Sequence, residues 1–224
     1  MNVTPASRVG EIAAHHPLAT RVFARHGIDF CCGGGVPLAE ACARRGVAAD
    51  VVVGEIDALL AGAPATREPW LEAPLGALVE HIVTTFHRPL REELPRLEAM
   101  ARKVARVHAE RDPEGRLPAI EATVVALRGE LEDHMAREEA VLFPALLDGH
   151  PDLPFEVFEA EHAAAGDGLA RLRELTEDYV APADACNTWR ALWAGLEDLE
   201  TVMHEHVHLE NNILFPRASG GAAS

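Results

Sequence analysis

Two stretches of the sequence carry a histidine followed four residues later by a glutamate, each inside an apolar stripe of helical period. Burying an ionised carboxylate without a nearby positive charge is costly, so two such pairs in a core call for a cation. A metal ion supplies that charge. The two stripes are Leu127, Leu131, His134, Glu138, Val141 and Ala145, and Leu192, Leu196, Leu199, Met203, His206, Glu210 and Ile213.

Two further helical stretches each place one histidine, His87 or His162, on their apolar side. Short connections make consecutive helices antiparallel. At ~1.5 Å per residue, the six residues then lie about 9 to 20 Å from one end of a bundle. Any one of these six could be an ordinary hydrogen-bonded residue of the core. That explanation does not account for six of them at the same depth. The candidate metal ligands are His87, His134, Glu138, His162, His206 and Glu210.

Four imidazoles and two carboxylates exceed what a single tetrahedral zinc needs. They suit two metals bridged by the glutamates, with a further bridge from water or oxide, and iron fits this donor set best. Six polar neighbours are expected to lie off this face because successive helical residues turn by about 100°. Of these, Glu161 could border the pocket but is expected on a solvated helix face, and His81 at most supports a ligand. The other four are expected to face water. The six are His81, Glu139, Glu161, His204, Glu205 and His208.

A second reactive motif is the pair Cys31 and Cys32, followed directly by three glycines. Accessible thiols beside free backbone N–H groups favour thiolate, redox or metal chemistry. The role considered for this pair is a redox reaction or iron delivery. Two small buried residues in a tight turn are an equal alternative. Adjacent cysteines make a strained disulfide. Cys42 and Cys186 are expected to be packing residues.

The elements that position these residues are predicted to be helices throughout, because alanine, leucine, glutamate and arginine are abundant and aromatic residues are few. A small helical domain is expected over residues 1–62, a proline-containing linker over 63–73 and a four-helix domain over 74–218. A kink or break is expected at Pro89 and Pro95 in the first long helix. The predicted helices span 17–27, 37–45, 51–60, 75–110, 118–147, 154–179 and 184–216.

The formal net charge of −16 disfavours nucleic acid and anionic membrane surfaces as partners. The amino terminus lacks the apolar run of a signal peptide, and no stretch of ~20 apolar residues occurs. The cysteines do not form a disulfide ladder. A cytoplasmic protein is expected.

The order His, His-x-x-x-Glu, His, His-x-x-x-Glu over four helices resembles the haemerythrin-like domains, which implies an up-down four-helix bundle. Residues 29–34 (Asp-Phe-Cys-Cys-Gly-Gly), 106–108 (Arg-Val-His) and 209–216 (Leu-Glu-Asn-Asn-Ile-Leu-Phe-Pro) resemble the family called repair of iron centres. This resemblance covers essentially the whole chain. It implies two non-haem iron ions at the same six ligands and a cysteine pair at Cys31 and Cys32.

The resemblance implies a protein that repairs iron-sulfur clusters damaged by nitrosative or oxidative stress, by donating iron, by reducing nitric oxide, or by both. Whether it is an enzyme of the nitric oxide reductase type is left open. The alternatives are a haemerythrin-like redox or gas sensor, an oxygen-binding protein, and a bundle that binds zinc adventitiously. Expected partners are damaged iron-sulfur proteins and nitric oxide or dioxygen as small ligands, with homodimerisation open.

Overall fold

The structure is a computed structural model that describes residues 2–61, 69–112, 114–150 and 152–220. Every regular element among these residues is a helix, apart from one isolated bridge between Arg8 and Pro37, which confirms the all-α prediction. Residues 81–203 form one unit, and the first 80 residues form another together with the segment after Met203. Within the described ranges, every helix falls short of the length and apolar character needed to traverse a lipid bilayer.

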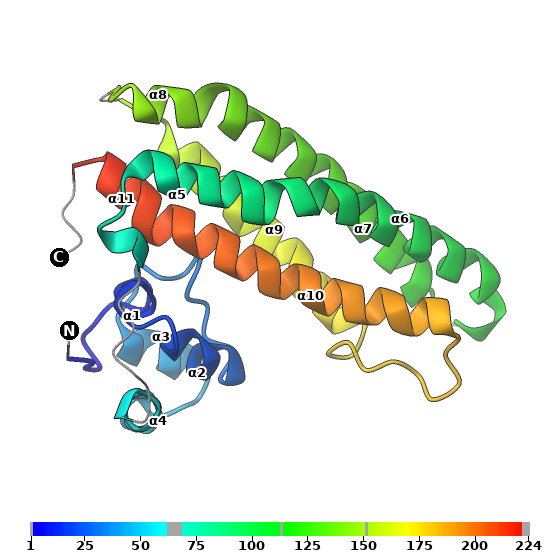
Figure 1. Cartoon of the computed structure of the whole chain (residues 1–224). Helices are drawn as coiled ribbons and strands as arrows, with labels where there is room; N and C mark the ends of the chain where they lie inside the picture. Colours follow the sequence, from blue (N-terminus) through cyan, green and yellow to red (C-terminus); the bar gives the residue numbers. More distant parts are fainter. Residues whose placement is uncertain (1, 62–68, 113, 151, 221–224) are drawn as a thin grey trace. The chain divides into compact units, whose positions relative to one another are not determined.

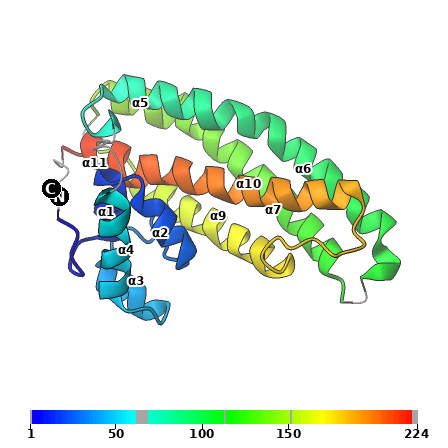
Figure 2. The same cartoon turned by 60° about the horizontal axis from the view of Figure 1, so that its bottom comes forward.

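Four long helices that run alternately up and down build the unit of residues 81–203 (Figure 1). Figure 2 shows the same alternation from a second direction. α6 packs against α7, and α7 packs against α9. The short 3₁₀ turn η3 (Ala109–Arg111) follows α6. The four helices are α6 (Arg88–Val107), α7 (Arg116–Arg137), α9 (Phe155–Leu175) and α10 (Asn187–Leu209), of which α10 continues into the other unit.

Three continuous helical segments each contain one π-helical turn, and each of these turns includes a predicted ligand. These turns are η2 (Val83–His87) between α5 (Leu75–Ile82) and α6, η4 (Glu138–Leu142) between α7 and α8 (Phe143–Leu147), and η5 (Glu210–Leu214) between α10 and α11 (Phe215–Ala218). After each turn, one backbone N–H bonds a carbonyl five residues back, and the next residue is a proline. A proline ring collides with the carbonyl four residues back in an α-helix. The wider turn accommodates the proline without ending the helix.

These π turns change which side chains are buried. Val141 is 64% exposed, whereas Leu142 and Phe143 are buried. The predicted stripe through Val141 was therefore wrong, because a π turn spaces its backbone hydrogen bonds five residues apart and shifts the register. The helix changes to π geometry just before Pro89, but α6 runs on through Pro95, so the break considered at Pro95 does not occur.

The amino-terminal part of the other unit is a module of four short helices. Ile12, Phe23, Leu38 and Ile56 are fully buried and form its core. α1 was not predicted. No side chain caps its first turn, and it is held instead by backbone bonds from Val9 and Gly10 to the chain near residue 35. The helices are α1 (Val9–His15), α2 (Ala19–Arg25), α3 (Leu38–Arg44) and α4 (Ala49–Ala61).

The predicted linker 63–73 lies mostly outside the described residues. Its end forms the 3₁₀ turn η1 (Pro69–Leu71). The guanidinium of Arg217 in α11 donates hydrogen bonds to the carbonyls of Trp70 and Ala73. This part of the linker is thus tied to the carboxyl-terminal helix within the same unit.

Candidate metal centre

Four of the predicted ligands converge in the unit of residues 81–203. Nε2 of His87 lies 3.4 Å from Oε2 of Glu138, and Nε2 of His134 lies 3.2 Å from Oε1 of Glu138. Nε2 of His162 lies 2.9 Å from Nε2 of His134 and 4.0 Å from Oε1 of Glu138. At most 4% of any of these four side chains is exposed. Three separate helical segments thus bring their donor atoms to one buried place.

The local backbone structure orients these four side chains. His87 is the last residue of the π turn η2, and Glu138 is the first residue of the π turn η4. His134 lies one turn before Glu138 on α7, and His162 lies on the buried face of α9. Single π turns inside α-helices are rare and are frequent at functional sites. Two π turns therefore occur at residues that supply donor atoms to this site.

Carboxylates hold the outer nitrogens of two of the imidazoles. Nδ1 of His87 donates to Oε1 of Glu139 over 2.8 Å, and Nδ1 of His134 donates to Oε2 of Glu161 over 2.8 Å. An ionised carboxylate only accepts hydrogen bonds, so each Nδ1 carries the hydrogen, and in the neutral imidazole each Nε2 then presents a lone pair inward. Metal-binding histidines characteristically donate their second N–H to a carboxylate in this way.

The inward-facing atoms fit a cation. Two imidazole lone pairs, from His87 and His134, face the carboxylate oxygens of Glu138 in a buried site. Acceptors that face each other in a medium of low dielectric repel. A metal ion between them replaces this repulsion with attraction. The buried histidine and glutamate group is thus suited to hold a metal.

Arginines keep the two outer carboxylates charged. Arg91 lies 2.9 Å from Glu139, and Arg137 lies 2.7 Å from Glu161. Burial by itself would raise the pKa of Glu139, but the hydrogen bonds from His87 and Arg91 outweigh it and hold the pKa below its usual value. The pKa of Glu161 is lowered in the same way, against its burial, by Arg137 and His134.

The remaining two predicted ligands lie in the other unit. Nε2 of His206, near the end of α10, lies 3.1 Å from Oε1 of Glu210, the first residue of η5. Both residues are fully buried. The pair repeats the arrangement of His134 and Glu138, in which a histidine lies in the last turn of an α-helix and a glutamate four residues later opens a π turn.

Several of the neighbouring residues do not lie where the sequence predicted. Glu139 does not simply face water, and Glu161 borders the site instead of a solvated face, because each accepts a hydrogen bond from a histidine. His208 is buried, and His204 is half-buried, so neither is a solvent-side residue. Glu205 is exposed as expected. Periodicity cannot reveal such contacts, because each joins residues of two different helices.

The cysteine turn is organised by Asp29. Its Oδ1 accepts from the backbone N–H groups of Cys31 and Cys32 and from Sγ of Cys31, and its Oδ2 accepts from the N–H of Gly33. The two sulfurs lie 3.7 Å apart without a disulfide, as expected for neighbouring cysteines. One carboxylate oxygen and both sulfurs lie within 4.8 Å of one another, which would suit a transiently held metal.

Cys31 is less available than predicted. Only 5% of it is exposed, whereas Cys32 is half-buried. The hydrogen bond with Cys32 and burial, followed by the charge of Asp29, raise the pKa of the Cys31 thiol far above its usual range. Cys31 therefore fits the alternative of a small buried residue in a tight turn better than an accessible thiolate.

The cysteine turn is attached to the segment that follows Glu210. The amide of Asn212 donates to the carbonyls of Phe30 and Cys31, over 3.1 Å and 3.3 Å. The Phe30 ring packs edge-on against His208, with centroids 5.8 Å apart. Burial lowers the pKa of His208 to about 4, despite a hydrogen bond with the Phe30 backbone that raises it. The turn therefore rests on a neutral imidazole two residues from Glu210.

Comparison with known families defines the class of protein. Residues 78–218 match the family model described as "Hemerythrin HHE cation binding domain". Residues 5–60 match the model ScdA_N, described as a domain of unknown function (DUF542). The fold is thus a haemerythrin-type four-helix bundle preceded by a small helical domain.

Two relatives show the particular family. The iron-sulfur cluster repair protein YtfE of Pectobacterium atrosepticum is 40% identical over 218 residues, covering 95% of this chain and 96% of the relative. The protein of the same name from Yersinia pseudotuberculosis is also 40% identical over 218 residues, with the same coverage. The chain belongs to the YtfE family of iron-sulfur cluster repair proteins.

Proposed function

We propose that the buried histidines and glutamates hold two iron ions, with Glu138 and Glu210 shared between them. The inward lone pairs of His87 and His134 toward Glu138 carry this proposal. Membership in the haemerythrin family supports it, because the matched residues 78–218 include all six donors. Imidazole and carboxylate donors suit iron. The proposed ligands are His87, His134, Glu138, His162, His206 and Glu210.

In this proposal the protein repairs iron-sulfur clusters, as the name of its relatives states for them, and the damage that it repairs is nitrosative or oxidative. The bound irons supply iron for donation, or the electrons for nitric oxide reduction. The protein residues bind and orient the metal, keep Nε2 of two histidines deprotonated, and exclude bulk water. Clients are iron-sulfur proteins, and the small ligand is nitric oxide or dioxygen. A cytoplasmic location, a homodimer and the domain limits 1–62 and 74–218 stay predictions.

Cys31 and Cys32 serve redox exchange or iron delivery in this proposal. Asp29 and the two sulfurs form a small donor group. The half-buried Cys32 is the sulfur that contacts a client, while Cys31 is buried. Replacing both cysteines with serine is expected to leave iron content unchanged and to slow the recovery of a damaged iron-sulfur enzyme mixed with the protein.

Metal analysis with a Mössbauer spectrum of the purified protein tests the centre. Two spin-coupled irons per chain are expected. Glu138→Gln and Glu210→Gln should each weaken metal binding or abolish the coupling, because each removes charge that offsets the cations. Glu205→Gln, at an exposed position next to a ligand, is the matched control. Unaltered coupled irons in both bridge variants would contradict the assignment.

The reaction of the reduced protein separates the alternatives. Consumption of nitric oxide, together with recovery of a damaged client enzyme, is expected. Reversible binding of dioxygen without client recovery would instead indicate an oxygen-binding protein. A partner whose affinity follows the oxidation state would indicate a redox or gas sensor.

A further inference from the structure

The unit of residues 81–203 holds a second reactive group far from the His/Glu centre. Sγ of Cys186 lies 3.3 Å from Nε2 of His108. His108 follows α6, about 30 Å along the helix from His87 at ~1.5 Å per residue. Cys186 is exposed and directly precedes α10, so the predicted packing role is wrong. A thiol within hydrogen-bond reach of an imidazole is the arrangement of a cysteine nucleophile and its base.

The imidazole is fixed in place. His108 is only 8% exposed, and its ring lies against Trp189, with centroids 4.9 Å apart. Trp189 in turn packs edge-on against Trp193, with centroids 5.6 Å apart. The base therefore presents its Nε2 to the thiol in one orientation, while the residue Cys186 is exposed.

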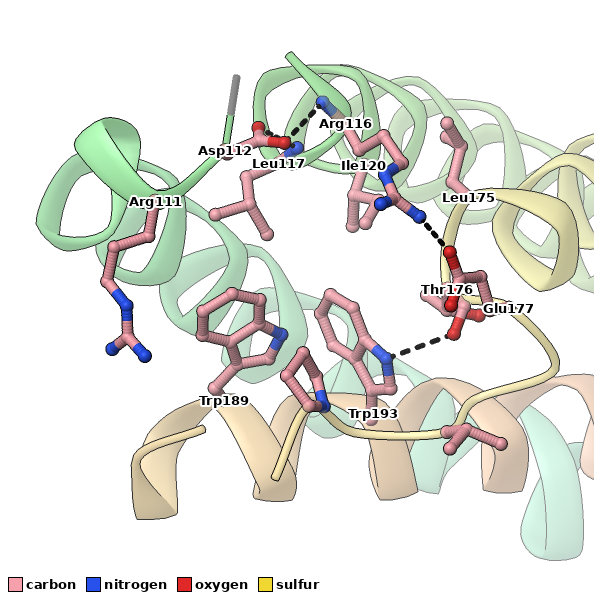
Figure 3. A pocket seen from close by; sticks show the side chains of 12 residues that line it. Arg111, Asp112, Arg116, Leu117, Ile120, Leu175, Thr176, Glu177, Trp189 and Trp193 are labelled. Carbon is pink, nitrogen blue, oxygen red and sulfur yellow. Dashed lines mark hydrogen bonds and ion pairs between the residues drawn. The ribbon is translucent and has the colours of Figure 1, made fainter. Parts of the chain in front are cut away.

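A cavity of about 110 Å³ lies beside Trp189 and is bordered by both tryptophans and by the loop at Val180 and Pro182 (Figure 3). Nε1 of Trp193 donates to the carbonyl of Thr176. Nε1 of Trp189 is buried and has no hydrogen-bond partner among the described residues. In Figure 3 it lies on the side of its ring toward Trp193. The cavity thus has two indole rings in its wall, near the start of α10.

Positive charge also follows Cys186 along the chain, since Arg190 lies one helical turn later. The guanidinium of Arg190 donates to the backbone carbonyls of Ala183 and Ala185 and forms no ion pair with a described residue. The nearby Asp184 is already paired with Arg111. The backbone N–H groups at the start of α10 add partial positive charge. An incoming molecule with a carboxylate is therefore favoured over a cationic one.

We propose that Cys186 undergoes reversible exchange with an anionic low-molecular-weight disulfide, with His108 as the base and Arg190 attracting the carboxylate. Nε2 of His108 accepts the thiol proton, and Sγ of Cys186 attacks one sulfur of the disulfide. The Cys186–sulfur bond forms as the sulfur–sulfur bond of the reagent breaks, and the leaving thiolate takes the proton from His108. The disulfide is the oxidant, and the products are one free thiol and a mixed disulfide at Cys186.

The test exposes the full-length protein to glutathione disulfide, which is anionic, or to cystamine, which is cationic. Peptide mass mapping follows each cysteine over time, and a cysteine-containing peptide serves as reference. Cys186 should react before the buried Cys42 and should favour glutathione disulfide relative to the reference. His108→Asn should slow both reagents about tenfold or more, because a positioned base is lost. Arg190→Gln should slow glutathione disulfide alone.

Matched controls are His150→Asn and Arg102→Gln, which change an exposed histidine and an exposed arginine elsewhere. An unmodified Cys186, or an unchanged rate in His108→Asn, overturns the proposal. An equal slowing of both reagents in Arg190→Gln also overturns it. Thermal melting shows whether each variant folds. If His108→Asn does not fold, the reagent preference of the parent and its loss in Arg190→Gln decide the matter.

Discussion

A carboxylate on the outer side of His87 decides which of its nitrogens faces Glu138. Because Nδ1 donates to Glu139, Nε2 keeps its lone pair for the interior, and Glu161 does the same for His134. Arginines in turn fix the two carboxylates. At the scale of single residues, the centre therefore depends on side chains that do not themselves reach it.

Glu139→Gln and Glu161→Gln should each lower the affinity for iron by about 10- to 100-fold, as expected when a carboxylate that orients a metal-binding histidine is lost. Both side chains are about one-third exposed, so the fold should persist. Competition with an iron chelator measures the affinity, and circular dichroism checks the fold. Glu205→Gln should change neither quantity. Iron binding as tight in both variants as in the parent would show that the outer carboxylates do not orient the ligands.

At the scale of elements, the π turns relate the positions of prolines to the positions of the glutamates proposed to bind metal. Phe143 precedes Pro144, and its N–H bonds the carbonyl of Glu138 five residues back. The same arrangement recurs at Phe215, which precedes Pro216 and bonds Glu210. In both cases the widened turn begins at a glutamate of the proposed centre. The proline thus helps to set the local path of the chain around that glutamate.

Pro144→Ala restores an amide donor and removes the ring that prevents an α-helical turn. The turn after Glu138 should tighten, shift the carboxylate and alter the Mössbauer spectrum of the iron. Pro95→Ala is the control, because Pro95 lies in an uninterrupted stretch of α6. It should leave the spectrum unchanged and raise the free energy of unfolding by about 1–3 kcal/mol. Identical spectra for Pro144→Ala and the parent would argue against this role of the π turn.

At the scale of the whole molecule, both ends of the chain belong to one unit. The cysteine turn receives hydrogen bonds from Asn211 and Asn212, about 180 residues later in the sequence. Arg217 binds the carbonyls of Trp70 and Ala73. The amino-terminal module is therefore held by the carboxyl-terminal segment as well as by the linker.

Gly34→Ala tests this attachment. A Cβ at Gly34 would lie 2.6 Å from Oδ1 of Asn212 and 2.8 Å from the carbonyl oxygen of Phe30. The clash should destabilise the unit by about 1–3 kcal/mol and speed the alkylation of Cys31. Gly35→Ala is the matched control, since its Cβ would meet nothing within 4 Å. Thermal unfolding and thiol labelling measure the two effects. Equal behaviour of the two variants would mean that this close contact does not hold the turn.

Several features could be read from the sequence because they depend on local periodicity. Histidines and glutamates at helical spacing within leucine-rich stripes predicted the helices, the burial of all six candidate ligands and the all-α class. The stops of α2 and α3 were also local, since Gly27 and Gly46 adopt the left-handed backbone that glycine tolerates best.

Other features were decided only by the tertiary structure. His87 meets Glu139 across 52 positions of the sequence, and His108 meets Cys186 across 78. Such pairs depend on how far each helix is shifted and rotated against its neighbours, which no periodic pattern encodes. The burial of Cys31 and His208 likewise requires the amino-terminal turn to lie on η5 and the end of α10. The sequence by itself determined which face each helix buries, whereas the packing of distant segments determined which buried side chains touch.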